Sequence, residues 1–202
     1  MTVEKGRDWG ETGPAPGGTV LVRSDGEARR ALEAARRSGE PLPTLGLLGG
    51  DLCRTLGGRG DEERLRTGGL RATVDLGVAL LDGKRHLFLA HLVVRRSWWR
   101  GPVVAVMNAQ FLGRWDVAPR AHPGDGRLDI LEGDLSVGDR WKARRRLPSG
   151  THVPHPGIRQ TRPTAWTTEL TRPAPVWLDG ERVAEAKTLA VRVEPDAVTV
   201  VV

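Results

Sequence analysis

The order of apolar and polar residues divides the chain into two regions. In residues 18–48, the apolar runs "GTVLV" and "TLGLL" flank a segment whose apolar residues recur at the spacing i, i+3, i+4 and i+7. The flanking runs predict buried strands, and the segment between them predicts an amphipathic helix that ends at Gly39. Because strands joined by a helical crossover pair in parallel, residues 18–48 are expected to form a parallel strand–helix–strand unit.

From about Leu70 onwards, short alternating runs replace the helical spacing. They are "ATVDLGVALLDGKRHLFLAHLVV", "PVVAVMNAQF", "GRLDILEGDL", "TAWTTELT", "APVWLDGERVA", "TLAVRVEP" and "AVTVVV", and one helical segment, "LSVGDRWKARRRL", stands among them. The pairs Asp82-Gly83 and Asp179-Gly180 are typical of two-residue hairpin turns. This region is therefore expected to be mostly antiparallel β.

The two patterns predict an α+β fold, in which a small parallel α/β region at residues 18–68 is followed by a mostly antiparallel β region at residues 69–202. Residues 1–17 are polar and contain prolines and several glycines, which indicates a disordered tail. After the second strand, "GGDLCRTLGG" is expected to hold a tight turn and a short helix capped by Asp51.

Composition narrows the class of partner and the compartment. The net charge of +6 is only a weak sign of a polyanionic partner, because an arginine-rich composition raises the net charge even in proteins that bind no polyanion. Nucleic acid is therefore not favoured as a partner. The sequence has no apolar run long enough to span a membrane and a single cysteine, Cys53, so we expect a cytoplasmic protein without an internal disulfide. The histidines and Cys53 show no zinc-binding spacing.

The tripeptide Asp-Gly-Glu occurs twice, and each copy has two interpretations. Asp25-Gly26-Glu27 stands where a strand ends and a helix begins, a place where backbone N–H groups attract phosphate. Ser24 and Glu27 also fit the Ser-x-x-Glu capping box, and the local pattern favours this structural interpretation. Asp179-Gly180-Glu181 fits a hairpin tip, yet the carboxylate of Glu181 could act as a general base if a hydroxyl substrate docks beside it.

Taken in order, these motifs resemble those of the diacylglycerol kinase-like lipid kinases, the superfamily that includes bacterial lipid kinases and sphingosine kinases. "RSDGE" and "GGDLCRTLG" stand where that family has its Gly-Gly-Asp-Gly-Thr and Gly-Thr-Gly-Asn-Asp turns. "VVAVMNAQFLGRWDVAPRAHPGDGRLDIL" is similar to its Asn-x-x-x-x-Gly, Ala-Pro-x-Ala and Asp-Gly-x-Leu-Asp signature, "GTHVPHPGI" to its Gly-x-His-x-x-x-Pro stretch, and "PVWLDGE" to its Asp-Gly-Glu. The resemblance covers residues 18–202.

The resemblance implies two domains, a partial Rossmann-like, nucleotide-binding α/β domain at residues 18–68 and a lipid-binding antiparallel β-sandwich at residues 69–202, with a cleft between them. ATP would donate a phosphate to the hydroxyl of a diacylglycerol-like or sphingoid lipid, with Glu181 as the base that deprotonates this hydroxyl. The cofactor-binding residues would be Asp25, Gly26, Gly49, Gly50 and Asp51. In bacterial members the Asp-Gly-x-Leu stretch helps to hold a structural magnesium, which puts Asp125 forward as a Mg²⁺ ligand.

The nucleotide side departs from the family pattern more than the lipid side does. The family's first strand–helix–strand layers have no counterpart, and the threonine that should donate to phosphate is replaced by Glu27. Two like charges about 4 Å apart repel by roughly 4 kcal/mol at an effective dielectric constant of about 20. We therefore predict that ATP binding is weak or absent, and two interpretations stay open: a weak or inactive lipid kinase, or a non-catalytic protein that binds lipid or a partner on the same fold.

Partners beyond the lipid are suggested by an edge and by two basic stretches. The sheet edge left by the missing layers makes a homodimer or a second chain a candidate. The pair Trp98-Trp99 is flanked by three arginines, and residues 141–146 read "WKARRR". Both stretches suit peripheral contact with an anionic membrane, and the second could also meet RNA. The patterns favour the structural alternatives, a packed tryptophan and a solvated helix face.

Overall fold

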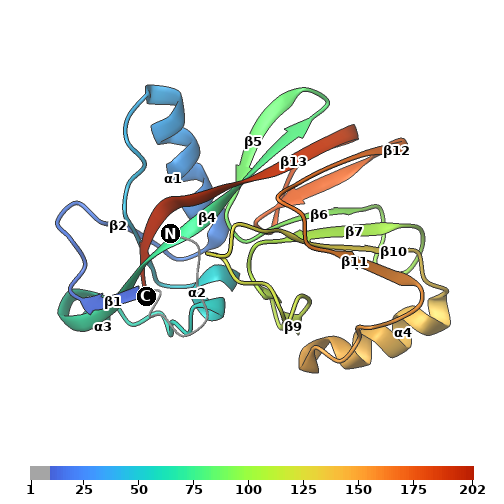
Figure 1. Ribbon diagram of the computed structural model, residues 1–202, viewed down its shortest axis with the longest axis horizontal. Helices are drawn as coiled ribbons and strands as arrows, with labels where there is room; N and C mark the ends of the chain where they lie inside the picture. The colour runs from blue at the N-terminus through green and yellow to red at the C-terminus, as the bar shows by residue number, and fades with distance from the viewer. Residues whose placement is uncertain (1–9) are drawn as a thin grey trace.

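Residues 10–202 are described by a computed structural model, which has an 11-stranded, mostly antiparallel sheet, four α-helices and a separate two-stranded ribbon (Figure 1). Along the sheet the strands follow the order β1-β4-β13-β12-β6-β7-β10-β11, with β5 beside β4 and with β3 joining β2 to β13. Within this part of the chain, no helix is long and apolar enough to cross a membrane. The helices are α1 (Asp25–Ser38), α2 (Asp51–Thr55), α3 (Glu62–Gly68) and α4 (Val137–Arg146), with a 3-10 turn η1 (Leu147–Ser149) after α4. The strands are β1 (Gly10–Gly13), β2 (Val20–Val22), β3 (Leu45–Leu47), β4 (Gly69–Leu81), β5 (Lys84–Phe88), β6 (His91–Arg95), β7 (Val103–Met107), β8 (Phe111–Leu112), β9 (Trp115–Asp116), β10 (Asp129–Gly133), β11 (Ile158–Thr161), β12 (Ala165–Leu178) and β13 (Glu181–Val201).

The predicted strand–helix–strand unit is present, because β2 and β3 pair in parallel and α1 connects them. The helix begins where the capping box places it: Oγ of Ser24 accepts a hydrogen bond from the N–H of Glu27. The Glu27 carboxylate in turn accepts from the N–H of Arg23. At the other end Gly39 adopts φ 74°, the left-handed conformation that ends a helix.

Two long strands, β4 and β13, change neighbours along their length. β4 pairs with β1 at its start and with β5 at its end. β13 pairs with β12 and with β4 in antiparallel fashion, and its far end pairs in parallel with β3. The short strands predicted over residues 164–202 are therefore merged into β12 and β13. Irregular pairing between Glu169 and Ala174, and between Glu194 and Val198, takes up the prolines that read as strand ends in the sequence.

Both predicted Asp-Gly hairpins are present, between β4 and β5 and between β12 and β13. Asp82 and Asp179 have φ 46° and 50°, and the glycine after each is also at positive φ, the pattern of a type I′ turn. The strand after the first hairpin is interrupted at residues 89–90. Because of this interruption β5 stays with β4, whereas β6 joins β7 and β12.

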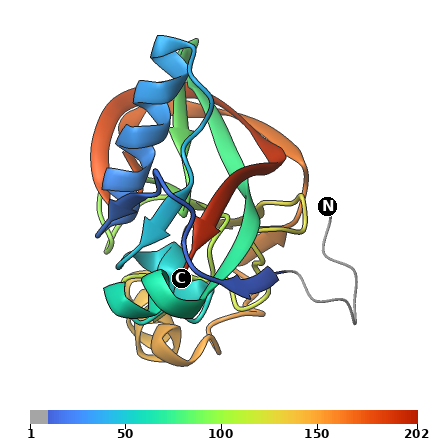
Figure 2. The ribbon, with the colours of Figure 1, turned by 90° about the vertical axis from the view of Figure 1, so that its left-hand side faces the viewer.

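Three groups of buried apolar residues form the core of residues 10–202. The first packs α1 and α2 against β2, β3 and parts of β4 and β13, so the strand–helix–strand unit shares its core with the long strands (Figure 2). The second lies between β12, β13 and the end of β4 on one side and β6, β7 and β10 on the other, and the third lies between β6, β7 and β10 and the segment that follows β9. α1 and α4 stand at opposite ends of the molecule (Figure 1).

The prediction that residues 1–17 form a disordered tail is wrong for part of this segment. Residues 1–9 lie outside the described residues, but Gly10–Gly13 form β1, which pairs with residues 69–72 of β4. The physical reason is that this stretch of β4 has a free edge, whose backbone groups the segment satisfies.

Candidate functional site

The two Asp-Gly-Glu tripeptides lie against each other. The start of α1 packs so closely on the turn between β12 and β13 that a Cβ atom on Gly26 would lie 2.8 Å from Oε1 of Glu181 and 3.4 Å from the carbonyl oxygen of Asp179. Glycine permits this approach because it has no side chain. The N-terminus of α1, where the sequence suggested a phosphate, therefore faces a carboxylate of the protein itself.

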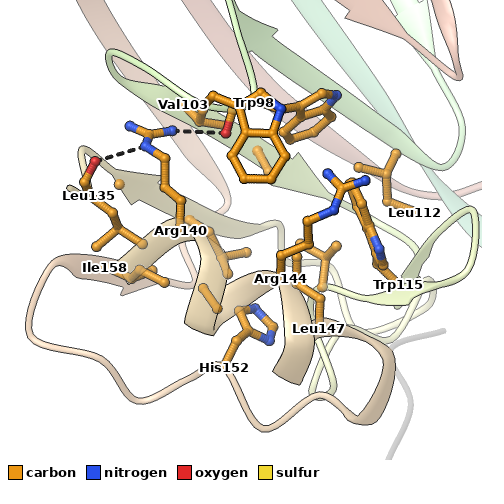
Figure 3. Close-up of a pocket in the computed structure, with 16 residues that line it drawn as sticks. Trp98, Val103, Leu112, Trp115, Leu135, Arg140, Arg144, Leu147, His152 and Ile158 are labelled. Atoms are coloured by element: carbon orange, nitrogen blue, oxygen red, sulfur yellow. Dashed lines mark hydrogen bonds between the residues drawn. The ribbon is translucent and has the colours of Figure 1, made fainter. Parts of the chain in front are cut away.

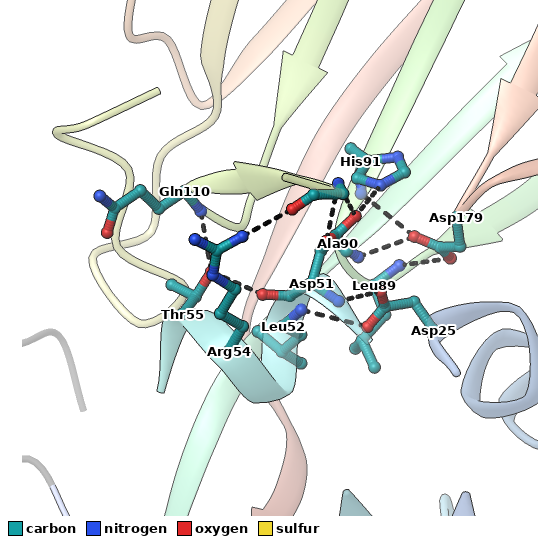
Figure 4. Close-up of polar contacts among 11 residues, drawn as sticks. Asp25, Asp51, Leu52, Arg54, Thr55, Leu89, Ala90, His91, Gln110 and Asp179 are labelled. Carbon is teal, nitrogen blue, oxygen red and sulfur yellow. Dashed lines mark hydrogen bonds and ion pairs between the residues drawn. The ribbon is translucent and has the colours of Figure 1, made fainter. Parts of the chain in front are cut away.

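Asp25 is buried at the start of α1, and its carboxylate caps a second helix, α2 (Figure 4). Oδ2 accepts a hydrogen bond from the N–H of Asp51 at 2.5 Å, and Oδ1 accepts from the N–H of Leu52 at 3.2 Å. These donors belong to the first turn of α2 and have no partner within the helix. The prediction that Asp51 caps this helix is wrong, because Gly50 is the N-cap residue and the acceptor is Asp25.

The Asp51 side chain connects α2 to the opposite wall of the site (Figure 4). Its carboxylate accepts from the N–H of Gly113 at 2.8 Å and contacts Nε2 of His91 at 2.9 Å. His91 is 2% exposed. Arg54 reinforces the connection, because it donates to the carbonyl oxygen of Gly113 at 2.7 Å and stacks on the ring of Phe111.

Asp179 is buried under its turn and holds the interruption between β5 and β6. Its carboxylate oxygens accept hydrogen bonds from the N–H groups of Leu89, Ala90 and His91 at 2.9, 2.8 and 3.1 Å. The side chain thus satisfies backbone donors at a point where the strand leaves one partner for another. Asp179 is a structural anchor as well as a turn residue.

Asp25, Asp51, His91 and Asp179 form what we call the enclosed cluster. Burial, reinforced by the charge of Asp179, raises the pKa of Asp25 to about 7, and burial also raises the pKa of Asp179. Burial alone would lower the pKa of His91, but the hydrogen bond to Asp51 and the charges of the nearby aspartates outweigh it, so the pKa of His91 is raised. A protonated His91 therefore offsets part of the negative charge of the cluster.

The enclosed cluster contains donor atoms of a type that divalent cations accept. One oxygen of Asp25, one of Asp51 and a ring nitrogen of His91 lie within 4.8 Å of one another. Every oxygen of the two carboxylates already accepts an N–H group. A cation here would compete with the capping of α2, so the arrangement fits a closed structural network better than a metal centre.

Glu181, the predicted general base, is held by two arginines of α1. Its carboxylate forms ion pairs with Arg29, at 2.5 Å, and with Arg30. The hydrogen bond from Arg30 and the charges of both arginines lower the pKa of Glu181. Because a lowered pKa weakens a base and both oxygens already face guanidinium groups, this arrangement does not prepare Glu181 to take a proton from a hydroxyl group.

The glycines before α2 also approach other parts of the protein closely. A Cβ atom on Gly49 would lie 2.5 Å from the carbonyl oxygen of Arg23, and one on Gly50 would lie 2.5 Å from Oδ1 of Asp25. Gly50 also has φ 98°, which other residues rarely adopt. The structure thus brings the five predicted cofactor-binding residues together, but they contact one another and their neighbours and do not fit a phosphate cradle.

Asp125 takes no part in these contacts and lies in the loop before β10. Its Oδ2 accepts from Arg162 at 2.5 Å, and its Oδ1 accepts from the N–H of Arg127 at 3.0 Å. Arg162 also binds Asp129, so one guanidinium group neutralises both carboxylates. Because the guanidinium group of Arg162 already lies where a metal ion would contact Asp125, the surroundings of Asp125 do not fit a magnesium site.

A cavity of about 360 Å³ opens beside the enclosed cluster. Its wall is mostly apolar, and we call it the polar cavity after the charged groups that line part of it. Asp51, His91 and Asp179 line one part of it, and Arg95 and several tryptophan rings line the rest. The Arg95 guanidinium stacks 4.4 Å from the ring centre of Trp98. The polar cavity therefore offers both acceptor groups and a cation to a polar ligand.

An apolar cavity of about 130 Å³ lies between α4 and strands β7 and β10 (Figure 3). We call it the tryptophan pocket, because Trp98, Trp99 and Trp115 form much of its wall. Arg144 of α4 stacks on Trp99 and on Trp115, and burial lowers the pKa of His152, which lines the pocket as a neutral imidazole.

The two cavities are neighbours, since Trp98, Leu112 and Trp115 line both of them. A cavity without carboxylates thus adjoins one that Asp51 and Asp179 line. Glu181 lines neither cavity. A ligand that filled both would meet the enclosed cluster but not the predicted base.

His91 carries no functional signal of its own in the sequence, and Arg95 stands out only as one of the three arginines that flank Trp98-Trp99. His91 lies within an apolar run that conceals the break between β5 and β6. The sequence gives no sign of the buried contacts of Asp179, because a hairpin turn alone explains an aspartate at this position. Only the order of family motifs pointed to this part of the chain.

A profile of the family described as the YegS C-terminal NAD kinase beta sandwich-like domain matches residues 78–202, more than half of the chain. No curated protein matches the chain in sequence. Among solved structures, it is similar to a protein assigned as a diacylglycerol kinase from Bacillus anthracis str. Sterne, with 14% identity and a TM-score of 0.62 over 89% of this chain and 84% of that chain. A diacylglycerol kinase from the same organism matches with 16% identity and a TM-score of 0.57 over 79% of this chain and 67% of that chain. At these identities the likeness is one of fold.

Proposed function

The chain belongs to the family of the YegS C-terminal NAD kinase beta sandwich-like domain, and from this premise we propose that it is a lipid-binding protein that has lost phosphoryl transfer. The resemblance to diacylglycerol kinase-like lipid kinases is thereby confirmed. In this proposal residues 18–68 are the remnant of a Rossmann-like nucleotide-binding domain, and residues 69–202 are the part that holds the lipid.

The contrast between an open apolar pocket and a closed polar cluster carries the proposal. The carboxylates of Asp25 and Asp179 accept hydrogen bonds from backbone N–H groups, and Glu181 forms ion pairs with two arginines. Phosphoryl transfer depends above all on positioned phosphates and metal ions, and these contacts occupy the groups that would position them. The tryptophan pocket has no such internal occupant and remains open to an acyl chain.

The lipid would lie across both cavities. Its hydrocarbon chain would pack against the tryptophan rings, where burial of apolar surface is favourable by about 25 cal/mol per Å². A free hydroxyl group, as in a diacylglycerol-like or sphingoid lipid, would lie in the polar cavity. There Asp51 could accept its proton in a hydrogen bond, and Arg95 could donate to a neighbouring oxygen.

Titration with dioctanoylglycerol in the absence of ATP tests the proposal, with intrinsic tryptophan fluorescence as the readout. Ala143 of α4 lines the tryptophan pocket, so Ala143→Phe should fill it and weaken binding at least about tenfold. Ala34→Phe is the matched control, because Ala34 is an exposed residue of α1 and should leave binding unchanged. Absence of binding by the wild type, or equal binding by Ala143→Phe, would overturn the proposal.

A second candidate is phosphoryl transfer from ATP to the lipid hydroxyl with Mg²⁺ present. It is favoured by one observation, that the carboxylates of Asp51 and Asp179 line the cavity next to the tryptophan pocket. Radiolabelled ATP and a panel of lipids decide between the two. Labelled lipid formed by the wild type and not by Glu181→Gln would establish the kinase, whereas lipid binding without labelling would support the non-catalytic protein.

A further inference from the structure

The exposed part of α4 and the adjoining loop form a patch that mixes apolar and basic side chains. We call it the α4 surface, and its members are Val137, Trp141, Arg145 and Arg146 of α4 and Trp99 of the β6–β7 loop. Val137, Trp141 and Trp99 are 55%, 54% and 43% exposed. Val137, Trp141 and Arg145 follow one another at i, i+4 and i+8, so they share one side of the helix.

The charges of α4 separate into an inner and an outer set. Arg140 points inward, where it donates to backbone carbonyl oxygens, among them that of Leu135. On the outside, the acidic Asp139 is paired with Lys142 at 3.1 Å. Arg145 and Arg146 are exposed and form no ion pair within residues 10–202, so their positive charge is available to an external partner.

The exposed rings are associated with arginines of the same helix. Arg145 lies 4.9 Å from the ring centre of Trp141, and Arg144 lies 5.2 Å from that of Trp99. Tryptophan rings with cations beside them are favoured at the boundary between lipid headgroups and acyl chains. The exposed aliphatic Val137 adds a group that gains by leaving water.

We propose that the α4 surface docks on an anionic lipid bilayer. A bilayer fits both halves of the patch, because the headgroups attract the arginines and the interface accepts Trp141, Trp99 and Val137. RNA fits less well, since Arg145 already covers a face of Trp141 that a base would need for stacking, and Val137 would stay in water.

Docking would bring the tryptophan pocket to the bilayer. Trp99 is exposed on the α4 surface and also lines the pocket, so the pocket adjoins this surface. Arg144 and Ala143 of α4 line the same pocket. This link to lipid entry rests on the proposed function, whereas the docking itself rests on the α4 surface alone.

Flotation with vesicles tests the docking. The wild type should bind vesicles of phosphatidylcholine mixed with phosphatidylglycerol, fail to bind pure phosphatidylcholine vesicles, and lose binding as salt is added. Arg145→Gln/Arg146→Gln should weaken binding roughly 30-fold, and Val137→Ser/Trp141→Ser should weaken it at least about tenfold. Arg59→Gln/Arg64→Gln is the matched control, with the same change of charge at exposed positions outside α4, and should bind like the wild type.

Two further measurements separate the outcomes. Dioctanoylglycerol binding by Arg145→Gln/Arg146→Gln in vesicle-free solution should be unchanged, so that a failure of docking is distinct from a failure of the pocket. Circular dichroism checks that each variant is folded. Equal vesicle binding by wild type and α4 variants, or salt-sensitive RNA binding by a wild type that leaves vesicles alone, would overturn the proposal.

Discussion

The enclosed cluster and the tryptophan pocket are neighbours in the fold, yet the protein fills the first with its own groups and leaves the second open. Buried carboxylates cannot remain without partners, because an unsatisfied buried polar group costs about 1–3 kcal/mol and an unpaired charge costs more. Asp25 and Asp179 meet this requirement through backbone N–H groups. The wall of the tryptophan pocket is mostly apolar, and apolar side chains carry no comparable demand, so the pocket can stay open for a ligand.

Under the proposed function, this difference would follow from the loss of a catalytic site beside a binding site that remains. Polar residues would then persist where they cap a helix or hold a strand interruption. The contact of Glu27 at the start of α1 and the ion pairs of Glu181 are consistent with such a change. The predictions below test whether the cluster is structural while the pocket is functional.

The largest effect is expected from Asp179→Ala. It leaves three buried N–H groups without their acceptor, so the free energy of unfolding should fall by about 3 kcal/mol or more, as measured by urea denaturation. Asp82→Ala is the control, because Asp82 occupies the same place in a turn of the same type and shares the cost of a positive φ. Its carboxylate also accepts from the N–H groups of Lys187 and Thr188, but these residues are exposed, so water can replace the lost acceptor. Equal losses in the two variants would contradict the structural role of the Asp179 carboxylate.

A moderate effect is expected from pH. The pKa of Asp25 is about 7 in the folded protein and near 3.8 when unperturbed, so the folded state binds the proton more tightly and stability should fall as pH rises from about 4 to about 7. The raised pKa of His91 acts in the same direction, because its stabilising proton is lost as pH rises through the folded pKa. Urea denaturation across this range should give a shallower dependence of stability on pH for Asp25→Asn, and an unchanged dependence would be evidence against a raised pKa of Asp25.

The smallest effect is expected from Glu181→Gln. The Glu181 side chain is 43% exposed, and exposed ion pairs contribute about 0–1 kcal/mol, so unfolding should change by less than about 1 kcal/mol. Dioctanoylglycerol binding should be unchanged, because Glu181 lines neither cavity. Isothermal calorimetry together with urea denaturation checks both points, and a large loss of lipid binding would place Glu181 in the lipid site.

Local patterns predicted the elements well where short-range chemistry decides them. Ser24, Glu27 and Gly39 marked both ends of α1, and Asp-Gly pairs marked two hairpins. The merging of short strands into β12 and β13 was not predictable, because bulges absorb prolines only when a neighbouring strand supports them.

The candidate site was predictable in its members and not in their contacts. Motif order singled out Asp25, Asp51 and Glu181, which the structure brings to one region. The capping of α2 by Asp25 joins residues 26 positions apart, and the contact of Glu181 with Arg30 joins residues 151 positions apart. Such long-range partners are decided by packing, which a local pattern does not contain.

The pairing of β13 with β3 has a consequence for how the protein acquires its structure during synthesis. The core that begins with Val22 is completed by Val198 and Val200, so the strand–helix–strand unit emerges from the ribosome long before its remaining core residues are made. Contacts between distant segments form slowly because a long loop must first close. Until β13 has been synthesised, part of the apolar surface of α1 and β3 stays accessible to solvent. During this interval the nascent chain is most prone to aggregate and most accessible to chaperones.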